Sequence, residues 1–400
     1  MTCFYPSCLR AAVLSGILVI SQSAVLAGAQ SAQLASTPPM GWNSWNHFAG
    51  KVTDADVRAA ADAMVTSGMR DAGYVYVNVD DTWQGQRDGQ GNIHPNSRFP
   101  DMKALADYVH SKGLKFGIYS SPGPKTCAGF EGSYGHEEQD AQTYADWGVD
   151  FLKYDLCGLR EIMRLYDPGQ DPEKANSIMR DAYVKMHKAL VKTGRPIVYS
   201  ICQYGMDAVW EWGAEVGGNL WRTTDDISDS FRSMALIGFS QAGLEHFAKP
   251  GHWNDPDMLE IGNGGMNPDE YRTQMSLWAI LAAPLLAGND LSKMDETTKS
   301  ILMNKEVIAV DQDKLGIQGW RVVPLQTWVK PLSGGAKAVV LFNFVTDDVP
   351  QPIRLRLKEI GFQGPVHARD LWDHKDLGII HESYTVTPPK GGVVMLRLWE

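Results

Sequence analysis

Positive charge, cysteine and long apolar runs are all scarce in this chain of 400 residues. It has 37 Lys and Arg residues against 47 Asp and Glu, which gives a formal net charge of −10. An acidic balance without a basic cluster argues against a nucleic-acid partner. Beyond the N-terminal segment, no stretch stays apolar for long enough to cross a bilayer. We therefore expect neither a nucleic acid nor, once that segment is removed, a membrane as a partner.

The N-terminal segment holds the one long apolar run. Arg10 is its basic residue, residues 11–26 are mostly apolar, and Ala27-Gly28-Ala29 has the small-x-small pattern of a cleavage site. We predict a secretory signal peptide over residues 1–29. A membrane anchor is the alternative, but polar residues interrupt the run and it is short for a span. The signal peptide implies export, to the periplasm or to the medium.

Only five cysteines are present, and two of them, Cys3 and Cys8, would leave with the signal peptide. The mature chain then keeps Cys127, Cys157 and Cys202. An exported protein with three thiols is expected to form one disulfide and leave one thiol free. Composition does not choose the pair.

Motifs for metals and phosphates are also lacking. No two histidines have the spacing of a zinc site. The segment DGQGN at residues 88–92 resembles a calcium loop faintly, but it lacks the spaced glycine and the final glutamate. The segment GWNSW at residues 41–45 is not a glycine-rich phosphate turn, which disfavours an open doubly wound sheet. We predict no cofactor and no catalytic metal.

Strand-like and helix-like stretches alternate from about residue 39 to residue 310. This rhythm, repeated about eight times, predicts a (β/α)8 TIM barrel over residues 30–310. The expected strands are residues 74–79, 115–120, 151–156, 196–202, 219–224, 252–257 and 284–287, and the clearest helices are 102–111, 137–147, 175–193 and a segment around 275–282.

The pattern changes after about residue 310. Short strand-like stretches follow one another without helices between them, and Gly- and Pro-containing turns separate them. This predicts a C-terminal antiparallel β-sandwich domain over residues 311–400. Its expected strands include residues 339–344, 353–357, 366–371 and 393–398.

Charged and polar residues gather at the C-terminal ends of the expected strands, where β/α barrels place their active sites. Lys153 and Asp155 lie two positions apart, so they share one face of a strand. Each such residue alone has a structural explanation, as a helix cap, a turn or an ion pair. Together they predict one pocket, formed by Trp45, Asp80, Asp81, Tyr119, Lys153, Asp155, Cys202, Gln203, Arg222, Asp226, Asp255 and Asp257.

Paired carboxylates at strand ends, with Lys and Arg beside them, are what hydrolysis of a glycosidic bond requires. Lys153 would keep Asp155 ionised, as a nucleophile needs. The second catalytic carboxyl must hold a proton, so we expect it to be buried or to have an acidic neighbour such as Asp225. The chain is predicted to be a glycosidase.

The order of motifs along the chain resembles glycoside hydrolase family twenty-seven, the α-galactosidase and α-N-acetylgalactosaminidase family. The resemblance covers essentially the whole mature chain, from Pro38 through the terminal β domain. Its motifs are GWNSW (41–45), NVDDTW (78–83), GIYS (117–120), KTCAGF (125–130), DWGVDFLKYDLC (146–157), WRTTDDI (221–227) and WNDPDML (253–259).

The resemblance implies roles for single residues. Asp155 would be the nucleophile and Asp226 the general acid/base of a retaining double displacement. It also implies a Cys127–Cys157 disulfide beside the sugar site, with Cys202 free on a pocket strand. The implied sugar-binding positions are Trp45, Asp80, Asp81, Tyr119, Lys153, Arg222 and Asp257, with Asp80 and Asp81 on the 4- and 6-hydroxyls.

One segment departs from the family. Where α-galactosidases often have Cys-Glu-Trp, this chain has Cys202-Gln203-Tyr204, which the resemblance places against the 2-substituent of the sugar. Gln203 can hydrogen-bond a 2-hydroxyl and is bulkier than the residues that admit an N-acetyl group. We therefore expect α-galactosidase activity rather than α-N-acetylgalactosaminidase activity.

Other readings stay open at this point. The family includes enzymes that act on β-L-arabinopyranosides or isomalto-dextrans. A non-catalytic carbohydrate-binding barrel would be expected to lack a catalytic carboxylate, and both Asp155 and Asp226 are present. Residues 159–176 look like an inserted loop that sets aglycone preference. The terminal domain either caps the barrel or forms the interface of a homo-oligomer.

Overall fold

The computed structural model describes residues 1–2, 34–165, 167–323, 326–344 and 351–400. The predicted signal peptide lies outside the described residues, apart from the first two, and so do Cys3 and Cys8. None of the helices in these ranges is long and apolar enough to span a membrane. The described residues from 34 to 400 form one compact unit.

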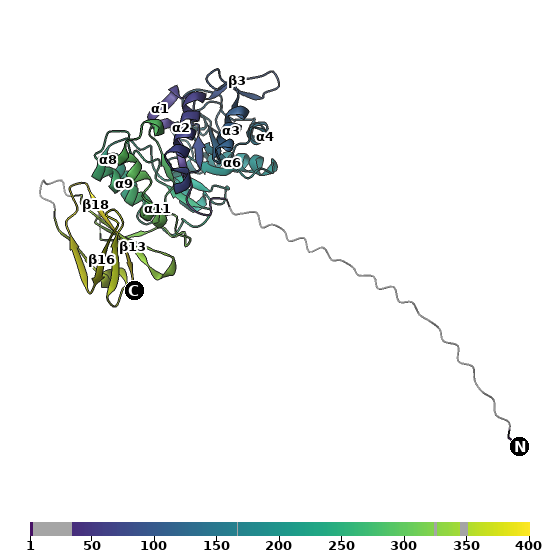
Figure 1. The fold of residues 1–400 in the computed structure, drawn as a ribbon. Helices are drawn as coiled ribbons and strands as arrows, with labels where there is room; N and C mark the ends of the chain where they lie inside the picture. Colours follow the sequence, from purple (N-terminus) through teal and green to yellow (C-terminus); the bar gives the residue numbers. More distant parts are fainter. Residues whose placement is uncertain (3–33, 166, 324–325, 345–350) are drawn as a thin grey trace. The chain divides into compact units, whose positions relative to one another are not determined.

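Eight parallel strands form the predicted barrel. Figure 1 shows helices α2, α3 and α6 of this part of the chain, in the purple-to-teal range of the colours. The eight strands are hydrogen-bonded in the order β10-β1-β2-β5-β6-β7-β8-β9. A parallel bridge between Leu259 and Ala287 closes the ring, because Leu259 follows β9 and Ala287 lies in β10. The strands are β1 (Met40–Asn43), β2 (Tyr76–Asn78), β5 (Lys115–Ser120), β6 (Phe151–Tyr154), β7 (Val198–Ile201), β8 (Leu220–Arg222), β9 (Trp253–Asp255) and β10 (Leu285–Ala287).

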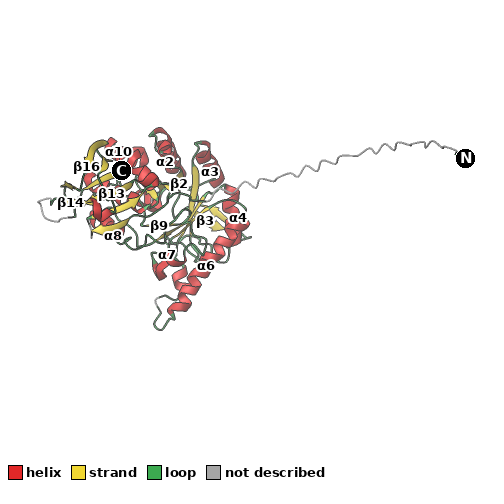
Figure 2. Cartoon of the chain, turned by 90° about the horizontal axis from the view of Figure 1, so that it is seen from below, coloured by secondary structure: helices red, strands yellow, loops and turns green. Residues whose placement is uncertain are grey.

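Helices lie outside the ring, as Figure 2 shows for α2, α3, α4 and α6 around the strands. The buried positions of α3, at Met102, Leu105, Ala106 and Val109, recur with the spacing of one helix face. The helices are α1 (Trp45–Phe48), α2 (Asp54–Thr66), α3 (Met102–Ser111), α4 (Glu137–Trp147), α5 (Leu159–Ile162), α6 (Pro172–Lys192), α7 (Val209–Trp212), α8 (Phe231–Phe239), α9 (Pro268–Leu281), α10 (Glu296–Leu302) and α11 (Lys305–Asp311).

Two local features differ from the sequence-based expectation. Helix α6 begins at Pro172 rather than at Ala175, because the Asp171 side chain accepts a hydrogen bond from the backbone N–H of Glu173 and caps the helix. The calcium-like segment is the turn of an unpredicted hairpin, β3 (Gln84–Arg87) and β4 (Ile93–Pro95). In that turn the Asp88 carboxylate accepts hydrogen bonds from the backbone of residues 90 and 92.

The predicted antiparallel sandwich follows the barrel. A six-stranded sheet has the order β11-β12-β13-β18-β15-β16, and β14 pairs with β17. Apolar side chains of both sheets, among them Val339, Leu341 and Leu355, form one buried cluster. The strands are β11 (Trp320–Val323), β12 (Thr327–Pro331), β13 (Lys337–Phe342), β14 (Ile353–Arg356), β15 (Val366–Asp370), β16 (Lys375–Ile380), β17 (Ser383–Val386) and β18 (Val393–Trp399).

The sandwich packs on helix α9 of the barrel through β12, β13 and β18. Trp328 and Phe342 of the sheet belong to the same buried cluster as the barrel helices, and both rings contact Phe239 of α8. The fully buried Lys330 ammonium donates to the carbonyl oxygens of Ala279 and Asp311. The predicted boundary at residues 310 and 311 falls at the end of α11, and the domain limits stay a prediction.

Gly41 marks a close approach of two barrel strands. It pairs with Tyr76 of β2, and a Cβ atom at this position would lie 2.3 Å from the Tyr76 carbonyl oxygen and 2.7 Å from its Cβ. Since both are atoms of a buried strand, Gly41→Ala must push β1 and β2 apart. We expect the free energy of unfolding to fall by about 1–3 kcal/mol, as for other overpacked positions.

Urea unfolding monitored by tryptophan fluorescence measures this effect. Gly364→Ala is the control, because a Cβ there meets no atom within 4 Å. Equal unfolding free energies for the two variants would contradict the close approach.

Candidate active site

A pocket of about 240 Å³ opens where the barrel strands end. All of the residues predicted for the pocket line it except Cys202, Gln203 and Asp255. Both cysteines of the expected disulfide line it as well. Asn46, Tyr204, Ile227 and Met258 also line the pocket and were not predicted. The residues that the sequence analysis grouped therefore do converge, whereas their chemical roles stay predictions.

Asp155 lies at the inner wall of the pocket, directly after β6, with 4% of its surface exposed. Its Oδ1 accepts hydrogen bonds from the Leu156 backbone N–H and the Tyr204 hydroxyl, both at 2.7 Å. Its Oδ2 accepts one from the Tyr119 hydroxyl at 3.1 Å. Burial raises the pKa of Asp155, while the charge of Lys153 and the Tyr204 hydrogen bond oppose that rise.

Lys153 forms its ion pair with Asp80, whereas we expected its nearest partner to be Asp155. Its ammonium is 2.9 Å from Asp80 Oδ2, and it acts on Asp155 only through its charge. Asp80 also accepts a hydrogen bond from the Asn43 side chain at 2.8 Å. The physical reason is the barrel geometry, which brings Asp80, just beyond β2, within reach of the Lys153 side chain from β6.

Asp81 is held rigidly beside Asp80. Its Oδ2 accepts from the Ala128 backbone N–H at 2.8 Å and its Oδ1 from the Thr82 N–H at 2.6 Å. The carboxyl is buried, and burial raises its pKa to about 6. Asp80 and Asp81 thus present fixed acceptors to whatever occupies the pocket.

Arg222 forms ion pairs with two carboxylates that line the pocket, those of Asp226 and Asp257. Its guanidinium, 3% exposed, lies 3.1 Å from a carboxylate oxygen of Asp226 and 3.1 Å from one of Asp257. Asp257 has a left-handed backbone with φ 83°, and its N–H donates to Asp255, which lies behind it. One buried cation therefore orients two carboxylates at once.

Asp226 differs from the expectation for a proton-holding carboxyl. Its side chain is 68% exposed, because Arg222 fills the interior and leaves the carboxylate at the pocket mouth. Asp225, the neighbour proposed to influence it, is exposed and does not line the pocket. Burial is therefore not what distinguishes Asp226 in this structure.

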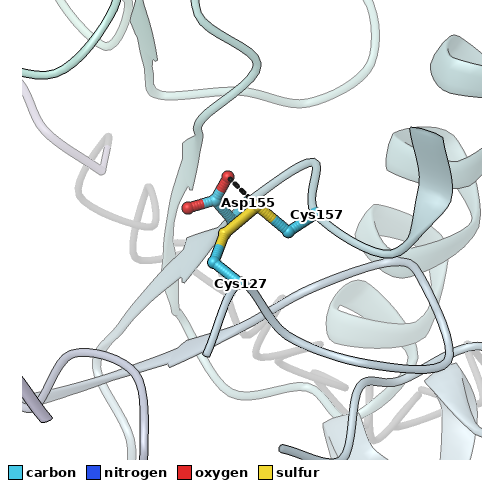
Figure 3. A group of neighbouring side chains, drawn as sticks. All are labelled: Cys127, Asp155 and Cys157. Carbon is cyan, nitrogen blue, oxygen red and sulfur yellow. Dashed lines mark hydrogen bonds between the residues drawn. A yellow bond between two sulfur atoms is a disulfide. The ribbon is translucent and has the colours of Figure 1, made fainter. Parts of the chain in front are cut away.

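The disulfide implied by the resemblance is present between Cys127 and Cys157. Figure 3 shows it beside the Asp155 carboxylate, with Cys157 Sγ 4.0 Å from Asp155 Oδ1. The two sulfurs and a carboxylate oxygen lie within 4.8 Å of one another. Since the sulfurs are bonded to each other, they offer no thiolate to a metal ion. Cys202 is buried and free, and burial raises the pKa of its thiol.

The segment after β7 differs from the expectation, because Tyr204 and not Gln203 lines the pocket. Gln203 is 0% exposed and does not line the pocket, and its amide has no hydrogen-bond partner among the described residues. Tyr204 turns into the pocket instead, because its backbone is left-handed with φ 62° and reverses the chain direction. No local sequence signal marks this turn except the Gly205 that follows it.

Residues 159–176, the expected inserted loop, contain α5 and the start of α6. Arg160 of α5 lies over the Tyr204 ring, 4.8 Å from its centroid. This places one end of the loop next to the pocket, and its effect on aglycone preference stays a prediction.

Comparisons with known proteins agree with this geometry. The family model of α-galactosidase A matches residues 37–313, and that of the α-galactosidase C-terminal β-sandwich domain matches residues 323–398. This chain belongs to the α-galactosidase family. It is 46% identical to α-galactosidase A of Cellvibrio japonicus, over 92% of this chain and 93% of that one. It is 47% identical to the α-galactosidase of Cyamopsis tetragonoloba, over 87% and 82%.

Solved structures of family members share the fold. α-Galactosidase I from Mortierella vinacea superposes with a TM-score of 0.83 at 35% identity, over 92% of this chain and 98% of that one. The α-galactosidase of Saccharomyces cerevisiae, solved with raffinose, has a TM-score of 0.83 at 30% identity and the same coverage. The resemblance to glycoside hydrolase family twenty-seven is confirmed, and the chain is a glycoside hydrolase.

Family members with other activities are also similar to this chain. The α-N-acetylgalactosaminidase of Gallus gallus is 39% identical over 91% of this chain and 94% of that one. A β-L-arabinopyranosidase from Geobacillus stearothermophilus superposes with a TM-score of 0.77 at 27% identity, over 92% and 97%. Family membership alone therefore leaves the sugar to be argued from the pocket.

Proposed function

We propose that this chain is an exported retaining α-galactosidase, with Asp155 as the nucleophile and Asp226 as the general acid/base. The observation that carries the proposal is the pairing of two unlike carboxylates in one pocket. Asp155 is buried and its oxygens are fixed by three donors, whereas Asp226 stands exposed at the mouth. A fixed carboxylate suits attack on carbon, and an exposed one suits proton exchange with the leaving group and water.

The reaction proceeds in two displacements. Asp155 attacks the anomeric carbon, the bond from that carbon to the glycosidic oxygen breaks, and Asp226 gives its proton to the departing oxygen. A water molecule then attacks the same carbon, Asp226 takes a proton from it, and Asp155 leaves as a carboxylate. Two inversions at one carbon retain its configuration.

The pocket walls supply the remaining roles. Asp80 and Asp81 offer the acceptors that we assign to the 4- and 6-hydroxyls of galactose, and Lys153 donates beside them. Trp45 lines the pocket and offers an aromatic face to the C–H side of the ring. Arg222 holds both Asp226 and Asp257 near the 2-hydroxyl.

The choice of galactose over N-acetylgalactosamine now rests on Tyr204 rather than on Gln203. Tyr204 contacts the Oδ1 atom of Asp155 and lies 5.7 Å from the Arg222 guanidinium, measured to the ring centroid. The space beside the nucleophile and Arg222 is where a 2-substituent points, so the phenol ring leaves little room for an acetamido group. Tyr204 therefore favours an α-galactosidase.

The first experiment compares hydrolysis of the p-nitrophenyl glycosides of α-galactose, α-N-acetylgalactosamine and β-L-arabinopyranose. We expect the α-galactoside to be hydrolysed fastest and Asp155→Asn to lose activity on it by about 10³-fold or more, since the nucleophile is gone. Isothermal titration should show that this variant still binds galactose. A faster rate on another glycoside would overturn the sugar assignment, and no rate on any would favour the non-catalytic barrel.

Azide separates the roles of the two carboxylates. In Asp155→Ala, azide should attack the anomeric carbon of the aryl α-galactoside from the vacated face and yield β-galactosyl azide. In Asp226→Ala, the glycosyl-enzyme still forms from this activated substrate, and azide should yield α-galactosyl azide. The anomeric configuration is read by proton NMR.

Asp225→Ala is the matched control for the azide experiment. Asp225 is exposed and lies outside the pocket lining, so this variant should release galactose as the wild type does. Azide products of the opposite configuration, or α-galactosyl azide from the Asp225 variant, would contradict the assigned roles.

Export and assembly are parts of the proposal that depend on the sequence alone. The signal peptide over residues 1–29 is inferred from its composition, and the N-terminal residue of the purified protein decides whether cleavage follows Ala29. The periplasm and the medium are both compatible with it, and a homo-oligomer is compatible with the sandwich. The substrates we propose are oligo- or polysaccharides with terminal α-galactosyl residues.

A further inference from the structure

Tyr204 has an unusual backbone at the edge of the active site. It follows β7 with φ 62°, and Gly205 continues the turn with φ 76°. A Cβ at residue 205 would lie 2.1 Å from the carbonyl oxygen of Thr223, the residue that follows β8, so the two chain segments lie very close together at this point. A left-handed conformation is unfavourable for a tyrosine and is kept where surrounding contacts fix it, often at functional sites.

Two arginine side chains contact the Tyr204 ring. The Arg160 guanidinium lies 4.8 Å and the Arg222 guanidinium 5.7 Å from the ring centroid. Two cations near one aromatic ring favour a fixed ring orientation. In this orientation the hydroxyl of Tyr204 is 2.7 Å from Asp155 Oδ1.

We propose that Tyr204 is a positioning residue of the nucleophile. Together with the Leu156 N–H, its hydroxyl holds Oδ1 of Asp155, so that Oδ2 is the atom that bonds to the anomeric carbon. This inference rests on the proposed function and adds to it a residue that replaces the tryptophan expected from the family.

The hydrogen bonds to the two carboxylate oxygens of Asp155 support the assignment of Oδ2 as the atom that bonds to carbon. Oδ1 accepts two donors, at 2.7 Å each, which occupy both of its lone-pair directions. Oδ2 accepts only the Tyr119 hydroxyl, at 3.1 Å, among the described residues. One lone pair of Oδ2 therefore stays available for the anomeric carbon.

Tyr204 and Leu156 donate to Oδ1 of Asp155 during both displacements. When a lone pair of Oδ2 forms the bond to carbon, the glycosidic C–O bond breaks and Oδ1 becomes the ester carbonyl oxygen. When the ester bond to carbon breaks, the electron pair returns to the carboxylate, whose charge Tyr204 and Leu156 again stabilise. Burial and nearby negative charge raise the pKa of Tyr204, so its hydroxyl keeps its proton throughout.

The charges around Asp155 come from several elements. Lys153 on β6 favours its ionised form, and Asp80 after β2 opposes it. The hydroxyls of Tyr119 on β5 and Tyr183 on α6 and the Cys202 thiol after β7 are further ionisable groups that interact with it. The Arg222 guanidinium on β8 lines the same pocket. Because the Tyr204 hydrogen bond favours the ionised carboxylate, its loss must raise the pKa of Asp155 further.

The test is Tyr204→Phe, which keeps the ring and removes only the hydroxyl. With the p-nitrophenyl α-galactoside we expect kcat to fall about 10- to 100-fold, as for the loss of one hydrogen bond to a charged group. KM and the affinity for galactose should change little. The acidic limb of the pH dependence of kcat/KM should move to higher pH, since Asp155 must be ionised to attack.

Tyr108→Phe is the matched control. The Tyr108 hydroxyl donates to Asp62 on the outer helices, away from the pocket, so removing it should leave the kinetics and the pH profile unchanged. A purely structural role of Tyr204 would lower stability without moving the acidic limb.

A second variant strengthens the hydrogen bond from residue 204 instead of removing it, and it nearly keeps the native side-chain shape. Site-specific 3-fluorotyrosine at position 204 has a more acidic hydroxyl, which makes it a stronger donor. The acidic limb should then move to lower pH than in the wild type. This measurement stands even if the phenylalanine variant fails to fold.

Different results would overturn the role of Tyr204 and the proposed function. Wild-type kcat and pH profiles in both Tyr204 variants, with an inactive Asp155→Asn, would overturn the role of Tyr204 and leave the proposed function intact. A wild type without α-galactosidase activity, or an active Asp155→Asn, would overturn the proposed function itself.

Discussion

Closure of the ring of parallel strands is the constraint on which the rest of this structure depends. Most of these strands have only three or four residues, and the bridge between Leu259 and Ala287 completes the ring. Because all strands run in the same direction, the residues that follow them meet at one rim. Side chains as far apart in the sequence as Asn46 and Glu260, which are separated by 214 positions, thereby come within hydrogen-bonding distance.

Gathering so many acids at one rim creates an electrostatic problem that two cations solve. Asp80, Asp155 and Asp257 are all buried, and like charges at close range oppose ionisation. Lys153 pairs with Asp80, and Arg222 pairs with Asp257 and Asp226. Among the described residues, Asp155 has no ion pair and accepts hydrogen bonds from neutral donors. This difference leaves the charge of Asp155 available for the bond to carbon that we propose.

The sequence predicts most of the architecture because the barrel repeats one simple pattern. Helix α3, helix α4 and strand β5 have the predicted bounds, since glycines and apolar spacing mark their ends. The site residues at strand ends could be predicted for the same reason, since each follows a strand that the sequence pattern marks. What could not be predicted depends on backbone direction and on partners far away in the sequence. The left-handed turn at Tyr204 brings that residue, and not Gln203, into the pocket, and the reach of Lys153 to Asp80 depends on the spacing of β2 and β6.

The disulfide between Cys127 and Cys157 makes one wall of the pocket sensitive to the redox state of the compartment. It joins two segments 30 residues apart in the sequence and lines the pocket beside Asp155. In a reducing compartment the two sulfurs would be separate thiols, and the wall next to Asp155 would lack this covalent bond. The pocket wall nearest Asp155 is thus coupled to the redox state of its surroundings, and it differs between the reduced and the oxidised protein.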